Sequence, residues 1–202
     1  MLEKEKFNNF SIKIGNLLKK FGISPNMWTF FALVFALVSA FFIINQKFFV
    51  ASLFFFLSAL ADFFDGSVAR ATNKTTLFGA YFDTIIDRYV EAIILFSFLF
   101  LPLPSIFFES KVWIFLALFG GLMTTYAKAA AKEKDILEKE LPTNVFGRAV
   151  RTFLLFFAIF FSSFSLVYTT YVILLLSLVS NFTALERISR ILKKSKFRDA
   201  RS

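Results

Sequence analysis

Long apolar stretches alternate with short polar segments along most of the chain. Six of these stretches approach the roughly 20 residues that an α-helix needs to cross a bilayer. The predicted spans are about residues 26–45, 48–70, 76–101, 111–132, 145–164 and 168–188. Ser24 and Pro25 give a helix-start signal before the first span, and Pro102 follows the third. The pattern therefore predicts an all-α fold: a polytopic integral membrane protein with six transmembrane helices.

The N-terminal residues follow a different pattern. Apolar residues recur at helical spacing between Lys and Asn, at Phe7, Phe10, Ile14, Leu17, Leu18 and Phe21. Such an amphipathic segment is typical of a helix in the membrane interface, and we expect it to anchor the chain without taking part in chemistry. The predicted organisation is a juxtamembrane helix over residues 1–23, a six-helix domain over 24–190 and a basic tail over 191–202.

The distribution of positive charge orients the predicted spans. With six spans both termini lie on the same side, and that side receives all of the 23 Lys and Arg residues except Lys47 and Lys111. Because Lys and Arg are enriched in cytoplasmic loops, we expect both termini to be cytoplasmic. The formal net charge of +9 also favours contact with anionic lipid, whereas no basic soluble module indicates nucleic-acid binding.

Two residue types are missing from the composition, and their absence limits the chemistry. The chain has no Cys and no His, so a bound metal must be held by oxygen ligands. A general base near neutral pH must then be a carboxylate, a Lys or a Tyr.

Carboxylates cluster where the second and third predicted spans meet. Asp62 and Asp65 share one helix face, while Gly79, Asp83 and Asp87 recur every four residues on the next helix. A charge at the centre of a membrane helix costs about 2.5 kcal/mol or more. Facing carboxylates also repel one another unless they are protonated or neutralised. Oxygen ligation favours Mg²⁺, Mn²⁺ or Ca²⁺ as the neutralising ion, and four carboxylates suit two ions.

A buried salt-bridge network is the alternative interpretation of these acids. Arg70 and Arg88 lie nearby, but two arginines leave part of the charge of four aspartates uncompensated. Glu91 lies one turn beyond Asp87. We expect Glu91 to be a hydrogen-bonded structural residue, paired with Arg88, rather than a metal ligand.

The spacing of these residues resembles the signature of the CDP-alcohol phosphotransferase family. That signature reads D-x2-D-G-x2-A-R-x8-G-x3-D-x3-D. Every fixed position is matched, by Asp62, Asp65, Gly66, Ala69, Arg70, Gly79, Asp83 and Asp87. The segment from Pro25 to Thr29 is similar to a less specific family motif, Pro-Asn-x-x-Thr, that precedes the first span.

The resemblance implies a cytoplasm-facing enzyme of phospholipid synthesis that acts as a homodimer. Such an enzyme transfers the phosphatidyl group, or its ether-lipid equivalent, from a CDP-lipid to the hydroxyl of a polar alcohol and releases CMP. The implied ligands of two Mg²⁺ or Mn²⁺ ions are Asp62, Asp65, Asp83 and Asp87, and Asp87 is also the implied catalytic base. The implied contacts to the CDP moiety are Gly66, Ala69, Arg70, Thr76, Gly79, Asn26 and Thr29.

Basic residues at the ends of the fourth and fifth spans are candidates for binding the acceptor: Lys128, Lys132, Arg148 and Arg151. They either set the membrane topology or bind a phosphate, and the one-turn spacing of Arg148 and Arg151 suits a phosphate. A phosphorylated polyol is therefore the favoured acceptor, and these segments resemble the inositol-phosphate branch of the family. A glycerol-phosphate acceptor and transfer from CDP-inositol to inositol phosphate stay open.

A small cation transporter is the alternative of a different class, because aspartates within a membrane also bind transported ions. A transporter, however, would not require Gly66, Ala69 and Arg70 at fixed spacing.

Small residues on the fourth span offer a close-packing face, which packs either between the subunits of the expected homodimer or within one subunit. These residues are Ala117, Gly121 and Thr124.

Overall fold

The structure is a computed structural model that describes residues 2–72, 75–136 and 147–199. Apart from an isolated bridge between Ile106 and Phe108, the described residues form helices and their connections, which confirms the all-α prediction for this part of the chain. The helices group into two compact units, Met1–Ser97 and Phe98–Ser202.

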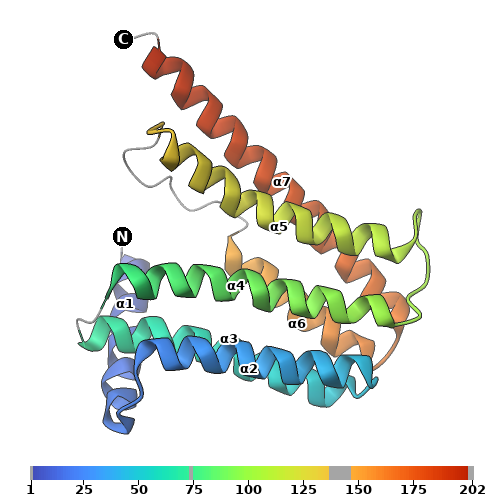
Figure 1. Cartoon of the computed structure of the whole chain (residues 1–202). Coiled ribbons are helices and arrows are strands. Elements are labelled where there is room, and N and C mark those ends of the chain that lie inside the picture. The colour runs from blue at the N-terminus through green and yellow to red at the C-terminus, as the bar shows by residue number, and fades with distance from the viewer. Residues whose placement is uncertain (1, 73–74, 137–146, 200–202) are drawn as a thin grey trace. The chain divides into compact units, whose positions relative to one another are not determined.

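The first unit contains the N-terminal helix and three longer ones (Figure 1). Its elements are α1 (Leu2–Leu18), the 3-10 turn η1 (Lys19–Phe21), α2 (Pro25–Ile44), α3 (Phe48–Thr72) and α4 (Leu77–Ser97). The long helix α2 packs against both α3 and α4, and α1 packs against α3. In Figure 1 the blue α1 runs across the direction of the other three helices.

The predicted start of α2 is confirmed. Ser24 is its N-cap, with the Ser24 hydroxyl accepting a hydrogen bond from the Met27 N–H at 3.4 Å, and Pro25 is the first helical residue. Just before it, Gly22 adopts a φ of 70°, a left-handed conformation that glycine tolerates best. The chain thus turns sharply from α1 and η1 into α2.

Small side chains join α2 to α3. The Ser39 hydroxyl donates to the Ala51 carbonyl at 2.8 Å, and the Ser58 hydroxyl donates to the Ala32 carbonyl at 2.7 Å. All four residues are buried. Small side chains let two apolar helices approach closely. In a membrane such packing and hydrogen bonding drive helix association, whereas the hydrophobic effect does not, because lipid tails are as apolar as the side chains.

The helix α1 packs on α3 through its small residues rather than its apolar ones. Ser11 and Gly15 are buried, whereas Phe10 and Leu17 are 57% and 61% exposed. A Cβ on Gly15 would lie only 2.1 Å from the Ser67 carbonyl oxygen, so the two backbones touch at this point. A helix thus forms over most of this segment, and its Phe10 and Leu17 side chains face outward. Its place in the membrane interface stays a prediction.

The second unit is built around the long C-terminal helix. Its elements are the 3-10 turn η2 (Phe98–Phe100), α5 (Ser110–Glu133), α6 (Arg148–Ser162) and α7 (Leu166–Asp199). The helix α7 packs against α5 and α6. At the α5–α7 contact, a Cβ on Gly120 would lie 2.7 Å from the Asn181 backbone nitrogen. The neighbouring small residues Ala117, Gly121 and Thr124 are buried in the single chain, so this face packs within one subunit.

In the part of the chain that the structure describes, four helices are long and apolar enough to cross a membrane: α2, α3, α5 and Leu166–Ser195 of α7. The helices α4 and α6 lie at the third and fifth predicted spans, but α4 carries several charged residues and α6 has only 15 residues. Residues 145–146 of the fifth predicted span lie outside the described residues. The count of six spans is not established by these helices. The predicted basic tail begins inside α7, which continues to Asp199.

Candidate active site

Three of the predicted metal ligands meet between α3 and α4. Carboxylate oxygens of Asp62 on α3 and of Asp83 and Asp87 on α4 lie within 4.8 Å of one another. All three residues are half-buried. The spacing of four places Asp83 and Asp87 on one face of α4, and α3 supplies Asp62 opposite them. Carboxylates so close together repel unless a cation or a proton lies among them. The group offers only hard oxygen donors, which fits Mg²⁺, Mn²⁺ or Ca²⁺.

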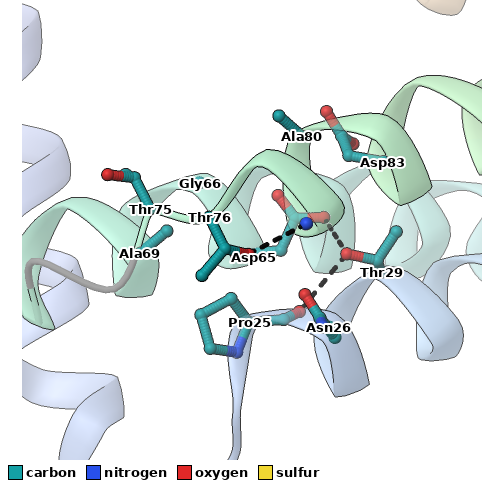
Figure 2. A pocket seen from close by; sticks show the side chains of 11 residues that line it. Pro25, Asn26, Thr29, Asp65, Gly66, Ala69, Thr75, Thr76, Ala80 and Asp83 are labelled. Atoms are coloured by element: carbon teal, nitrogen blue, oxygen red, sulfur yellow. Dashed lines mark hydrogen bonds between the residues drawn. The ribbon is translucent and has the colours of Figure 1, made fainter.

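The fourth predicted ligand, Asp65, is buried and is oriented by α2. The Thr29 hydroxyl donates to Asp65 Oδ2 at 2.7 Å and lies 3.3 Å from the Pro25 carbonyl oxygen (Figure 2). Thr29 is 3% exposed and Asp65 is 7% exposed. A buried carboxylate needs hydrogen bonds to replace those it made to water. Thr29, which the sequence indicated as a nucleotide contact, thus fixes the orientation of an acidic residue.

A pocket of about 130 Å³ opens beside Asp65 and Asp83. It is lined by residues of three helices and the connection before α4: Pro25, Asn26, Thr29, Asp65, Gly66, Ala69, Thr75, Thr76, Gly79, Ala80 and Asp83. The first turns of both α2 and α4 face it, as Figure 2 shows. Helix N-termini attract anions through their unsatisfied N–H groups and the helix dipole. Since ligand pockets usually measure about 300 Å³ or more, this one has room for part of a ligand, such as a phosphate group.

Gly79 allows the first turns of α2 and α4 to approach each other. A Cβ at this position would lie 3.0 Å from Thr76 Oγ1 and 3.1 Å from Asn26 Oδ1. The Gly79 backbone N–H donates to Thr76 Oγ1 at 3.0 Å, so Thr76 caps the start of α4. Three of the predicted CDP contacts therefore form one compact corner of the pocket.

The Arg70 side chain lies next to this pocket and is held from α1. Among the residues that the structure describes, Gly66 and Ala69 line the pocket and Arg70 does not. The Arg70 guanidinium lies over Gly66, where a Cβ would come within 3.2 Å of Nη1. On its other side, Arg70 Nε and Nη2 donate to the Ser11 hydroxyl at 3.2 and 2.5 Å.

The predicted pairing of Glu91 with Arg88 is confirmed. Arg88 Nη1 lies 2.5 Å from Glu91 Oε2, and both side chains are largely buried one turn beyond Asp87. Glu91 thus forms an ion pair with Arg88.

Two arginines converge on Thr124 in the second unit. Arg151, which is 5% exposed, donates from Nη1 to Thr124 Oγ1 at 3.0 Å. Arg187 on α7 donates from Nη1 to the Thr124 carbonyl oxygen at 2.6 Å. Of the other predicted acceptor residues, Lys128 is half-buried, and Lys132 and Arg148 are exposed. Neighbouring guanidinium groups are a typical arrangement for an anionic ligand.

The sequence matches a known family over most of its length. Residues 22–183 match the family described as CDP-alcohol phosphatidyltransferase, which covers most of the chain and both parts of the aspartate motif. The chain belongs to the CDP-alcohol phosphatidyltransferase family.

Two relatives are similar to this chain over more than half of its length. An archaetidylinositol phosphate synthase of Pyrococcus horikoshii is 29% identical over 153 residues, which cover 75% of this chain and 77% of that protein. A protein of Aquifex aeolicus is 33% identical over 122 residues, 60% of this chain, and the chain spans only 62% of its length.

Solved structures show the same fold. Mycobacterium tuberculosis phosphatidylinositol phosphate synthase with CDP-DAG bound matches with a TM-score of 0.71 at 20% identity, covering 91% of this chain and 94% of that one. The structure of the same enzyme with manganese and citrate gives a TM-score of 0.73 at 19% identity, covering 90% of this chain and 88% of that one.

Sequence reasoning missed two side chains of this CDP-alcohol phosphatidyltransferase. Ser11 lies in a segment whose apolar periodicity indicated only a membrane anchor, and Arg187 was counted only as a topology-setting cation. A buried serine gives no periodic signal. The spacing between Thr124 and Arg187 gives none either, because they are 63 residues apart.

Proposed function

We propose that this chain transfers the phosphatidyl group, or its ether-lipid equivalent, from a CDP-lipid to a hydroxyl of inositol phosphate and releases CMP. The observation that carries the proposal is the meeting of Asp62, Asp83 and Asp87 beside a pocket formed by two helix N-termini. The names of the Pyrococcus and Mycobacterium relatives support inositol phosphate as the acceptor.

The donor binds at the pocket in this proposal. The diphosphate of the CDP-lipid faces the first turns of α2 and α4, where backbone N–H groups and Thr76 are directed toward an anion. Gly66 and Gly79 carry no side chain, so the nucleotide approaches the backbone closely. The Arg70 guanidinium matches phosphate geometry and lies beside Gly66. Asn26, Thr29 and Ala69 complete the nucleotide contacts.

Two divalent cations, Mg²⁺ or Mn²⁺, are held in this proposal by four aspartates: Asp62, Asp65, Asp83 and Asp87. The manganese found in the Mycobacterium enzyme supports this assignment, as does the all-oxygen donor set. Bound ions of this kind stabilise the negative charge that develops on a phosphate during transfer. Thr29 holds Asp65 in the orientation for ligation.

Asp87 takes the proton of the attacking hydroxyl. In this step the acceptor oxygen bonds to the lipid-side phosphorus, the bond from that phosphorus to the bridging oxygen breaks, and CMP leaves with the bridging oxygen. The position of Asp87 within the half-buried acidic group supports its assignment as the base. The absence of His from the chain leaves a carboxylate as the natural choice of base.

The acceptor phosphate binds to basic residues of the second unit. Arg151 and Arg187 are anchored on Thr124 and carry their positive charge together. Three further cations add to the positive field: Lys128 and Lys132 near the C-terminal end of α5, and Arg148 at the start of α6.

The membrane arrangement of the proposed enzyme is six spans with the active site and both termini on the cytoplasmic side. In this arrangement α4 and α6 cross the membrane with the four apolar helices, and residues 24–190 form the catalytic domain. The excess of Lys and Arg on one side supports this orientation. The protein is proposed to act as a homodimer, with lipid and the two substrates as its other partners.

CMP release by the purified protein tests the proposed function. CDP-lipids with ester and ether tails are supplied with Mg²⁺ or Mn²⁺ and one acceptor at a time: inositol phosphate, glycerol phosphate, inositol or serine. CDP-inositol replaces the lipid donor in a parallel series. We expect CMP release with inositol phosphate, and none from Asp83→Asn. A preference for serine or inositol would contradict the acceptor assignment. Cation flux through vesicles without CMP release under any condition would favour a transporter.

A further inference from the structure

The N-terminal helix α1 touches the signature motif at one buried hydroxyl. Ser11 is 0% exposed, and its Oγ lies 2.8 Å from Ser67 Oγ and within hydrogen-bond distance of Arg70 Nε and Nη2. Close packing at Gly15, one turn along α1, brings this hydroxyl to α3. A polar group so completely buried must be satisfied by such partners.

The protons of this network can be assigned from chemistry alone. The Arg70 guanidinium only donates, so the Ser11 oxygen accepts both of its hydrogen bonds. The Ser67 hydroxyl donates to the Phe63 carbonyl at 2.8 Å, so it must accept from the Ser11 hydroxyl. A single chain of hydrogen bonds therefore runs from Arg70 through Ser11 and Ser67 to the backbone of α3. Hydrogen bonds arranged in series polarise and strengthen one another.

The same network holds the guanidinium beside the pocket. The Ser11 hydroxyl accepts from Nε and Nη2, and a Cβ on Gly66, which lines the pocket, would lie 3.2 Å from Nη1 and 3.4 Å from Nη2. Arg70 is exposed, and a long side chain at the surface otherwise samples many rotamers. Holding it in one rotamer before the ligand arrives removes an ordering cost from binding.

We propose that Ser11 of the N-terminal helix is a positioning residue of the nucleotide site, which fixes the Arg70 guanidinium so that it is ready to contact the diphosphate of the donor. This inference rests on the proposed function, in which Arg70 binds the CDP moiety. It assigns to α1 a part in donor recognition in addition to any contact with the membrane.

Binding of the CDP-lipid by five variants of the full chain tests this role. Ser11→Ala removes the hydroxyl that holds Arg70, and Ser67→Ala removes the group that orients the Ser11 hydroxyl. Asn16→Ala is the matched control, because Asn16 is an exposed polar residue on the same helix. Arg70→Ala, alone and combined with Ser11→Ala, completes a double-mutant cycle.

We expect Ser11→Ala to raise both the Kd and the KM for the CDP-lipid by about three- to tenfold, as for loss of a hydrogen bond to a charged group that is partly exposed to solvent. The kcat and the KM for the acceptor should change by less than about twofold, since the network touches neither the base nor the acceptor residues. Ser67→Ala should shift donor affinity in the same direction by a smaller factor. In the Arg70→Ala background, Ser11→Ala should have no further effect on donor affinity.

Two outcomes would overturn the inference. One is a Kd for the CDP-lipid in Ser11→Ala equal to that of Asn16→Ala. The other is an equal loss from Ser11→Ala with and without Arg70, because a purely structural effect of Ser11 does not depend on the arginine. If the unaltered chain binds the CDP-lipid but releases no CMP with any acceptor, the proposed reaction is rejected, and the Kd values still decide the role of Ser11. If it does not bind the CDP-lipid at all, both proposals are rejected.

Discussion

Thr29→Val should weaken metal binding while leaving the fold intact. The Thr29 hydroxyl donates to Asp65 Oδ2 at 2.7 Å in a buried position, and valine has nearly the same shape without the hydroxyl. A hydrogen bond to a charged group contributes about 1.5–3 kcal/mol. That loss corresponds to about 10- to 150-fold in a binding constant. Residues that support a metal ligand typically account for about 10- to 100-fold in affinity. We therefore expect the affinity for Mn²⁺ to fall by at least about tenfold.

The assay is a Mn²⁺ titration of the purified protein by electron paramagnetic resonance, which reports binding without turnover. The Mn²⁺ concentration for half-maximal CMP release provides a second measurement. Thr84→Val is the matched control, because Thr84 is exposed on α4 and its hydroxyl donates to the Ala80 carbonyl of its own helix at 2.8 Å. A Thr29→Val protein whose Mn²⁺ affinity stays within about twofold of Thr84→Val would refute the reasoning.

Three further predictions concern the base, the acceptor site and the fold. Asp87→Asn should abolish CMP release while CDP-lipid binding stays within about tenfold, since a base acts in the chemical step; near-normal turnover would remove Asp87 from this role. Arg151→Ala should raise the KM for inositol phosphate by about tenfold with a smaller change for the donor, and equal changes in both KM values would contradict an acceptor contact. Gly120→Ala should lower the free energy of unfolding by about 1–3 kcal/mol, because its Cβ would lie 2.7 Å from the Asn181 backbone nitrogen. An unchanged free energy of unfolding in detergent would contradict this prediction, because it would mean that α5 and α7 move apart to accept the added methyl group without loss of stability.

The positions of the helices could be predicted because their signals are local. Apolar runs define each helix, and Ser24 and Pro25 mark the start of α2 within one residue of the expected position. The predicted ends of α4 and α7 were less accurate. The helix α4 ends at Ser97 and is followed by a 3-10 turn, and α7 continues through a charged stretch to Asp199. In these regions hydropathy does not mark where the helix stops.

The acidic group could also be predicted, whereas its supporting contacts could not. Asp83 and Asp87 share a helix face by spacing alone, and α3 precedes α4 closely enough to bring Asp62 beside them. The contact between Thr29 and Asp65 spans 36 residues, and the contact between Ser11 and Arg70 spans 59. At such separations the sequence shows no periodic pattern that would predict the contact. Both contacts depend on how helices cross, which is determined by small residues such as Gly15 and by close backbone approach.

We propose above all that aspartates of α3 and α4 together form a divalent-metal site beside the proposed nucleotide pocket. Anomalous scattering from crystals of the protein grown with Mn²⁺ and CDP tests it directly, because the signal locates the ions without reference to activity. We expect two manganese peaks, ligated by Asp62, Asp65, Asp83 and Asp87, with the diphosphate of CDP facing the first turns of α2 and α4. Manganese bound elsewhere, or CDP bound with no manganese among these four carboxylates, would contradict it.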